Sequence, residues 1–474
     1  MKQLHELSIK EVLDGYTNKD FSCVDLVKHF LKRIEKYNPK LNIFLALNEN
    51  VLDQAGAIDK EIAEKGITRP LLGIPMAIKD NFMTIDISTT AGSNILKGYL
   101  PQYESTVTAK LLAAGAIFLG KTNMDSFAHG SSTETSDFGP TRNPWNQGML
   151  PGGSSGGSAA AIAAQLATVA LGSETAGSVR QPAAWCGVTG FKPTYGRAGR
   201  YGCIAMASST DSPGPIGKSV EDCALVTEVI AGKDPFDATT SPAPVEKYSQ
   251  SLYAPDLRGM RIGIVKEYLL SEMSPEVKNL IINAADKLKL LGATVEEVSL
   301  LDPHYSIGVY TVIQRSEVSS NLARFDGIRF GHQRDTFCEE SKRRIMLGTY
   351  TLSAGYYDAF YKKAQAVRTK IVSEFTDIFK TYDAIIGAVS PGPALAVGAT
   401  KNQSMFGEMQ DILLEPSSIA GLTSISVPCG FVDSLPIGLQ ITSDQLKETT
   451  VFKIADCYQR HTQFHLFPDL EKTI

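Results

Sequence analysis

The sequence predicts an α/β protein whose central sheet is mostly buried. Short apolar runs of strand length alternate with capped, amphipathic helical segments along the whole 474-residue chain. Hydrophobic residues make up 43% of the chain and charged residues 20%, as in ordinary globular proteins. No internal repeat, low-complexity tract or clear boundary interrupts the alternation, so we expect one domain spanning residues 1–474.

The N-terminal half supplies the first of these elements. Residues 1–66 are expected to be helical and to pack on the domain, with a helix that starts after Ser22 and stops at Asn38-Pro39. A strand is expected in the apolar run that ends at Lys79. A helix over 105–115, strands over 116–123 and 167–173, and a helix capped by Ser219 over 219–232 follow.

The C-terminal half continues the same alternation. Strands over 261–267 and 294–300 bracket a helix over 275–291, and helices fill much of 311–324 and 353–380. Three late strands are predicted over 383–389, 424–430 and 437–443. The order of elements therefore favours a layered α/β architecture.

Composition excludes several classes of function. The formal net charge of −5 argues against a chain that holds nucleic acid through its own field. The N-terminus lacks signal-peptide features, and no apolar run is long enough for a membrane span. Seven dispersed cysteines without a CxxC pair suggest reduced thiols and a cytoplasmic location. No cluster of His, Cys or Asp has metal-ligand spacing, so we expect no metal in this chain.

The stretch "LPGGSSGGSAAAIAA" (150–164) allows three interpretations. A phosphate-binding P-loop needs a lysine after its glycines, and none follows here. The GxSxG elbow of α/β-hydrolases must follow a buried strand, whereas "RNPWNQGMLP" precedes this one. In the third interpretation, a buried Lys79 loses its proton easily and activates one of two serines, Ser154 and Ser178, through the other. Turn residues and a surface ion pair explain the same spacing, so spacing alone leaves both open.

A resemblance that extends over a longer stretch of the sequence favours the interpretation with Lys79 and two serines. "PGGSSGGSAAAIAA" followed by "LGSETAGSVRQPAAWCGVTGFKPTYGR" resembles the amidase signature family. The resemblance implies a mixed central β-sheet covered by helices on both faces. It also implies a Ser–cis-Ser–Lys triad, with Ser178 as the nucleophile, Ser154 as the bridging serine with a cis peptide bond, and Lys79 as the base.

The same resemblance implies an oxyanion hole made by backbone N–H groups of Thr175, Ala176, Gly177 and Ser178. The family usually has Gly-Gly-Ser where this chain has Ala176-Gly177-Ser178. If residue 176 needs a positive φ, alanine weakens the hole; if not, the methyl group is harmless.

Within that family the resemblance is narrower. "GKTNMDSFAHGSSTETSDFGPTRNPWN" and "KRRIMLGTYTLSAGYYDAFYKKAQAVR" are similar to the A subunits of glutamyl-tRNA(Gln)/aspartyl-tRNA(Asn) amidotransferases. This implies a glutaminase in a heterotrimer with subunits B and C, which supplies ammonia for transamidation of misacylated Glu-tRNA(Gln), with Asp-tRNA(Asn) as a second candidate. ATP and Mg²⁺ are then used by the partner, with no cofactor in this chain.

Glutamine carries an α-carboxylate and an α-ammonium group, so its pocket needs one cation and one anion. By resemblance the pocket residues are Tyr310, Arg344 for the carboxylate, Asp411 for the ammonium group, and more weakly Ser131. Two alternatives stay open. A stand-alone amidase acting on small amides would not need Arg344 or Asp411. A scaffold protein weakened at Ala176 would bind partners without releasing ammonia.

Overall fold

An 11-stranded mixed sheet forms the centre of the computed structural model, which describes residues 2–401 and 405–474. Its strands are β1 (Phe44–Leu47), β2 (Pro75–Lys79), β3 (Ile117–Thr122), β4 (Val169–Glu174), β5 (Thr189–Lys192), β6 (Ser212–Gly217), β7 (Arg261–Val265), β8 (Thr294–Val298), β9 (Ala384–Ala388), β10 (Thr423–Val432) and β11 (Leu435–Ser443). Their order across the sheet is β1-β3-β2-β4-β6-β5-β10-β11-β9-β7-β8. Because β2 runs parallel to β3 and β4 whereas β10 and β11 are antiparallel, the predicted mixed sheet is confirmed.

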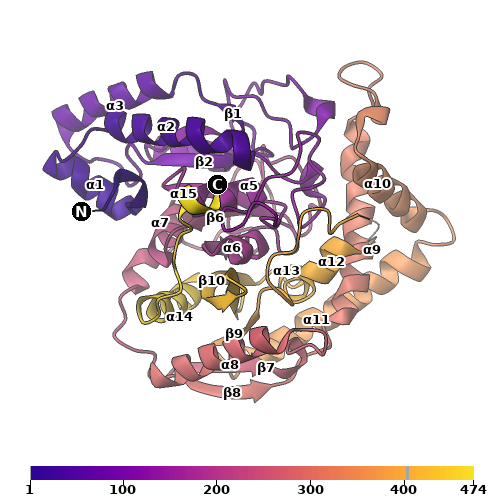
Figure 1. Cartoon of the computed structure of the whole chain (residues 1–474). Helices are drawn as coiled ribbons and strands as arrows, with labels where there is room; N and C mark the ends of the chain where they lie inside the picture. Colours follow the sequence, from indigo (N-terminus) through magenta and orange to yellow (C-terminus); the bar gives the residue numbers. More distant parts are fainter. Residues whose placement is uncertain (1, 402–404) are drawn as a thin grey trace.

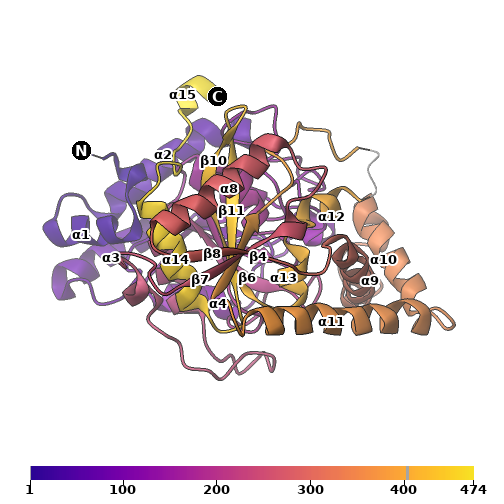
Figure 2. The ribbon, with the colours of Figure 1, turned by 90° about the horizontal axis from the view of Figure 1, so that it is seen from below.

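Helices cover both sides of this sheet. They are α1 (Ile9–Asn18), α2 (Cys23–Leu41), α3 (Val51–Lys65), α4 (Thr106–Ala113), α5 (Gly156–Ala163), α6 (Arg180–Cys186), α7 (Val220–Ile230), α8 (Pro275–Leu290), α9 (His304–Asn321), α10 (Glu339–Leu352), α11 (Lys363–Ile378), α12 (Phe406–Asp411), α13 (Glu415–Ile419), α14 (Glu448–Arg460) and α15 (Leu470–Thr473). Figure 1 shows α9, α10 and α11 grouped at one side of the molecule. In Figure 2 the α14 helix lies on one side of the central strands, and α12 and α13 lie on the other.

The alanine-rich helix α5 is buried along its whole length. It packs against β2 and β4, and small side chains let its backbone approach those strands closely. Gly157 also lies against the residue that follows β3, because a Cβ atom there would lie 2.4 Å from the backbone oxygen of Asn123. The run of small residues after the glycine-serine loop is therefore explained by packing.

Two features of the N-terminal segment differ from the prediction. The segment is not all helical, because β1 lies between α2 and α3 and pairs with β3. Helix α2 does not stop at Asn38-Pro39; it continues to Leu41, with Pro39 inside its last turn. That turn closes when the backbone N–H of Asn42, in the left-handed conformation, donates to the oxygen of Asn38.

The sequence pattern does not predict helix α10. The positions of its apolar and aromatic residues do not mark its buried face, because Met346, Leu347 and Tyr350 are exposed. Helix α9 also starts earlier than predicted, at His304, and a π-helical segment (Asp358–Lys362) precedes α11. Burial decides these boundaries more than hydrophobic periodicity does.

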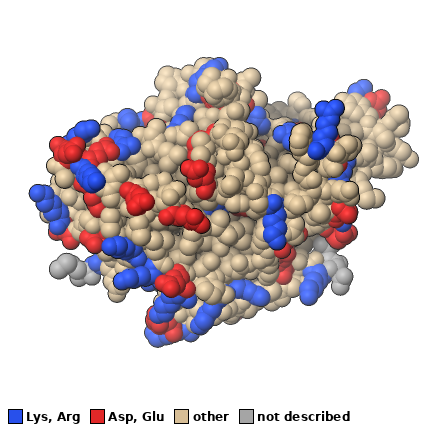
Figure 3. Space-filling model, turned by 90° about the horizontal axis from the view of Figure 1, so that it is seen from above, with Lys and Arg blue, Asp and Glu red and all other residues tan. Residues whose placement is uncertain are grey.

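Charged residues of both signs are interspersed on the face seen from above in Figure 3, and no extended basic field covers it. This face gives no sign of the basic stripe that a nucleic-acid-binding surface shows. Among residues 2–401 and 405–474, no helix has the length and apolar character needed to cross a bilayer.

Replacement of a buried sheet residue tests this packing. Leu119 in β3 is fully buried, so Leu119→Ala is expected to lower the free energy of unfolding by about 2–5 kcal/mol. Leu290, the last residue of α8, is 83% exposed. Leu290→Ala is therefore expected to change the free energy of unfolding by less than about 0.5 kcal/mol. Urea unfolding followed by circular dichroism measures both, and equal losses would contradict this packing.

Candidate active site

Lys79 is the last residue of β2 and is fully buried. Its Nζ donates to the hydroxyl of Ser154 at 2.7 Å and to the backbone oxygen of Ser173 at 3.0 Å. Burial disfavours the ammonium form and lowers the pKa of Lys79 from 10.5 to about 7, although nearby acidic groups oppose this. A neutral amine that can accept a proton is therefore available near neutral pH.

Ser154 lies in the loop before α5, and its peptide bond to Gly153 is cis. A Cβ atom at residue 153 would lie 2.1 Å from a carboxylate oxygen of Asp125 and 2.6 Å from the backbone nitrogen of Ser132. Only glycine fits this position. The backbone N–H of Gly153 also donates to the side chain of Gln181 at 2.9 Å, which fixes the loop against α6.

Ser178 lies between β4 and α6. Its backbone oxygen accepts a hydrogen bond from the N–H of Ser155 at 3.1 Å, so the two serine loops are in contact. The structure thus brings Lys79 and Ser154 into direct contact. Within the described part of the chain the hydroxyl of Ser178 makes no hydrogen bond, so its link to Ser154 is not formed in this conformation.

The loop formed by residues 175–178 carries free backbone donors. The N–H groups of these four residues make no hydrogen bond with any residue that the structure describes. The backbone φ of Ala176 is not positive, so its methyl group imposes no backbone strain. Gly177 is required by packing, because a Cβ atom there would lie 2.4 Å from Asp411 Oδ1. The loop therefore carries unpaired backbone donors, is tightly packed against Asp411 and reaches the pocket at Ser178.

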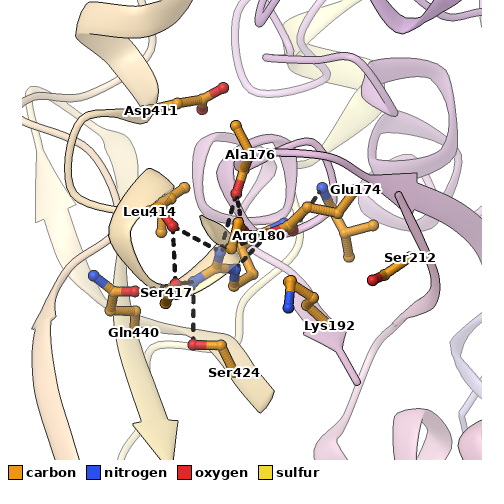
Figure 4. A network of polar contacts seen from close by, with 12 residues as sticks. Glu174, Ala176, Arg180, Lys192, Ser212, Asp411, Leu414, Ser417, Ser424 and Gln440 are labelled. Carbon is orange, nitrogen blue, oxygen red and sulfur yellow. Dashed lines mark hydrogen bonds and ion pairs between the residues drawn. The ribbon is translucent and has the colours of Figure 1, made fainter. Parts of the chain in front are cut away.

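Arg180 holds the 175–178 loop through a hydrogen bond to the backbone oxygen of Ala176 (Figure 4). It is fully buried, and its guanidinium group pairs with Glu174 Oε1 at 2.5 Å and donates to the backbone oxygen of Ala176 at 3.1 Å. It also donates to Ser417 at 3.0 Å and to Gln440 at 3.0 Å. One side chain thus connects β4, the 175–178 loop, α13 and β11. Sequence reasoning assigns no role to Arg180, although it lies inside the quoted motif.

The four residues that the sequence predicts for the glutamine pocket lie beside Ser178: Ser131, Tyr310, Arg344 and Asp411. They and Ser178 line one small pocket, together with backbone and side chains of Ala128, Gly130, Met206, Gly407 and Glu408. The pocket holds about 10 Å³ of open space, less than a glutamine side chain needs. Side chains in the pocket must therefore move to admit a ligand of that size.

The pocket contains both signs of charge. The Nε of Arg344 donates to Glu340 at 2.6 Å, and its Nη2 lies 3.9 Å from Glu408, which also pairs with Arg315 at 2.8 Å. Asp411 has no ion-pair partner among the described residues. Sequence reasoning missed Glu340, Glu408 and Arg315. Glu340 lies four residues before Arg344 on α10, a helix that the sequence pattern does not predict, and no spacing connects Arg315 in α9 or Glu408 in α12 with that helix.

Asp411 is the uncompensated acid of this pocket. Its Oδ2 accepts a hydrogen bond from the Ser131 hydroxyl at 2.7 Å, and its Oδ1 has no hydrogen-bond partner in the described structure. Burial raises the pKa of this carboxyl group well above its usual range, and the Ser131 hydrogen bond opposes that rise. A bound cation would reverse the shift and occupy the free oxygen.

Other candidate groups are structural. Burial raises the pKa of the Cys186 thiol well above its ordinary value, so it is a poor nucleophile. His129 is buried and its Nδ1 lies 3.0 Å from the hydroxyl of Ser341, which joins its loop to α10. In the part of the chain that the structure describes, no group of three or more His, Cys, Asp and Glu residues could hold a metal ion.

Comparisons with known proteins identify the family of this chain. The family model for amidases matches residues 25–452. The chain belongs to the amidase family. This amidase is 46% identical to the A subunit of the glutamyl-tRNA(Gln) amidotransferase of Listeria monocytogenes, with 98% of each chain covered. The resemblance inferred from the sequence is therefore confirmed.

Solved structures of amidases agree as well. The crystal structure of the A subunit of glutamyl-tRNA(Gln) amidotransferase from Thermotoga maritima is 38% identical to this amidase, with a TM-score of 0.83 and coverage of 99% of this chain and 98% of that one. The peptide amidase of Stenotrophomonas maltophilia is 29% identical, with a TM-score of 0.84 and coverage of 96% and 97%. The predicted amidase fold is confirmed.

The buried Glu174–Arg180 pair yields a test of stability. Arg180→Met leaves the Glu174 carboxylate buried without its partner, so we expect a loss of about 3–5 kcal/mol in the free energy of unfolding. The double variant Glu174→Gln/Arg180→Met removes both charges and should recover part of that loss. Urea denaturation of the two variants measures this. A double variant less stable than Arg180→Met would contradict the assignment.

Proposed function

We propose that the chain is the glutamine-hydrolysing component, the A subunit, of a tRNA-dependent amidotransferase. The observation that carries this proposal is the placement of Arg344 and an unpaired oxygen of Asp411 in one pocket with Ser178. An amide substrate without an ammonium group would leave the buried Oδ1 of Asp411 without a partner, whereas Arg344 already pairs with Glu340. The relatives that bear the name of this glutamyl-tRNA(Gln) amidotransferase component support the same assignment.

The proposed mechanism is a two-step acyl transfer. Lys79, in its neutral form, accepts a proton from Ser154 while Ser154 takes the proton of Ser178. The Ser178 oxygen attacks the side-chain amide carbon of glutamine, and the N–H groups of residues 175–178 stabilise the developing oxyanion. The proton returns to the amide nitrogen, ammonia leaves, and water then hydrolyses the glutamyl ester to glutamate.

Within this proposal Arg344 binds the α-carboxylate of glutamine, and Asp411 with Ser131 binds the α-ammonium group. Tyr310 lines the same pocket. The released ammonia is used by partner subunits, B and C by resemblance, which bind ATP, Mg²⁺ and the misacylated Glu-tRNA(Gln) or Asp-tRNA(Asn). We also propose that the chain is a single domain, which the continuous sheet supports, and that it is located in the cytoplasm.

The direct test is ammonia release from glutamine by the chain purified with the proteins that accompany it in its own cells. Release should rise with ATP and Glu-tRNA and should disappear in Ser178→Ala. A faster release from acetamide, indifferent to ATP and tRNA, would identify a stand-alone amidase. Partner binding without any ammonia release would identify a scaffold protein.

The low pKa of Lys79 predicts the pH dependence of the reaction. Since the neutral amine is the base and its pKa in the free enzyme is lowered to about 7, kcat/KM should reach half of its plateau near pH 7 and, well below that pH, fall about tenfold per unit. Lys192 is a matched control, because burial also lowers its pKa to about 7 although it lies outside the pocket. Lys192→Met should leave the midpoint of the profile unchanged, whereas a shifted midpoint would refute the assignment to Lys79.

The pocket charges predict a change in substrate preference. Arg344→Met and Asp411→Asn should each raise the KM for glutamine by roughly 10- to 100-fold, because each removes a hydrogen bond to a charged group. Acetamide lacks both charged groups, so its slow hydrolysis should be unaffected. Lys342→Met, on the same helix but paired with Glu339, is the control. Steady-state kinetics with glutamine and acetamide measures these effects. Equal losses of kcat/KM for the two substrates would exclude a role of Arg344 and Asp411 in recognising the charged groups of glutamine.

A further inference from the structure

Asp211 is a buried carboxylate at the start of β6 whose hydrogen bonds all come from two loops of the site. Its Oδ1 accepts from the hydroxyl of Thr175 at 2.7 Å, and its Oδ2 accepts from the backbone N–H of Met206 at 2.9 Å. The N–H of Ala207 lies 3.2 Å from one oxygen and 3.1 Å from the other. No ion pair involves Asp211 among the residues that the structure describes.

These contacts join the 175–178 loop to the segment that contains Met206. Thr175 is the first residue of the loop whose N–H groups are free, and its hydroxyl has no other partner in the described structure. Met206 lines the small pocket together with Ser178. Asp211 therefore fixes the spacing between the 175–178 loop and the segment that faces it.

Asp211 faces open space on its other side. It lines a cavity of about 730 Å³, bordered by side chains that include Arg200, Tyr201 and Cys203. The hydrogen bond from the Thr175 hydroxyl is the side-chain contact that ties the 175–178 loop to Asp211 and, through it, to the Met206 segment. Burial raises the pKa of Asp211 to about 6, and the carboxylate stays ionised and accepting at neutral pH.

We propose that Asp211 is a positioning residue that aims the free N–H groups of residues 175–178 by holding Thr175 against the Met206 segment. This inference rests on the proposed function. Donors of an oxyanion hole act only when they lie at hydrogen-bond distance from the oxygen that becomes charged. A displacement of about 1 Å can cost roughly 100-fold in rate, while Arg344 and Asp411 keep their own contacts with Glu340 and Ser131.

The experiment compares Thr175→Val and Asp211→Asn in ammonia release from glutamine, using the chain with its natural partners. Each is expected to lower kcat by about 10- to 100-fold with the KM for glutamine unchanged. The double variant should be no slower than the slower single variant, because both remove one interaction. Thr175→Ser keeps the hydroxyl and should restore most of kcat.

Thr210→Val is the matched control, because Thr210 lies beside Asp211 and its hydroxyl donates, among the residues that the structure describes, only to the backbone oxygen of Ala207, at 3.4 Å. It should keep the parent kcat. Full activity of Thr175→Val, additive losses, a change confined to KM, or an equal loss in Thr210→Val would each overturn the inference. If Asp211→Asn does not fold, the nearly isosteric Thr175→Val and Thr175→Ser pair decides.

Ser178→Ala, measured in parallel, separates this inference from the proposed function. If Ser178→Ala still releases ammonia, the proposed chemistry fails. If Ser178→Ala is inactive and Thr175→Val is fully active, only the role of Asp211 fails.

Discussion

The buried pair of Glu174 and Arg180 is the constraint on which the rest of the site depends. The two residues end β4 and begin α6, and the 175–178 loop lies between them. Both charges are removed from water, so neither side chain can move without losing a partner that nothing else replaces. Arg180 also reaches α13 and β11 through Ser417 and Gln440. The loop that carries Ser178 is therefore held in place by the C-terminal half of the chain.

Two buried lysines show that burial alone does not make a base. The pKa values of Lys79 and Lys192 are both lowered to about 7 by the same cause. Lys192 donates to the backbone oxygen of Leu422, which has no proton to give. Lys79 donates to the hydroxyl of Ser154, which has one. The difference between a structural lysine and a candidate base thus lies in the group that each contacts.

Most strands, and the contact between Lys79 and Ser154, could be predicted from sequence because they depend on local apolar runs and on one recognisable motif. Helix α10 could not, since its apolar side chains are exposed and its periodicity is misleading. Arg180, Glu408 and Asp211 were also missed. Glu408 pairs with Arg315, 93 residues away, and Arg180 reaches Ser417 and Gln440, 237 and 260 residues away, although its partner Glu174 is close in sequence. Only the folded topology brings such groups together, so no spacing rule identifies them.

The scattering of the pocket along the chain has a consequence for biosynthesis. Ser178 belongs to the first half of the chain, whereas Arg344 and Asp411 are translated much later. The close contact between Gly177 and Asp411 forms only when both halves are present. Under the proposed function, a chain still attached to the ribosome carries its nucleophile but cannot retain glutamine. Hydrolysis then begins only after synthesis is nearly complete, when partner subunits can receive the ammonia.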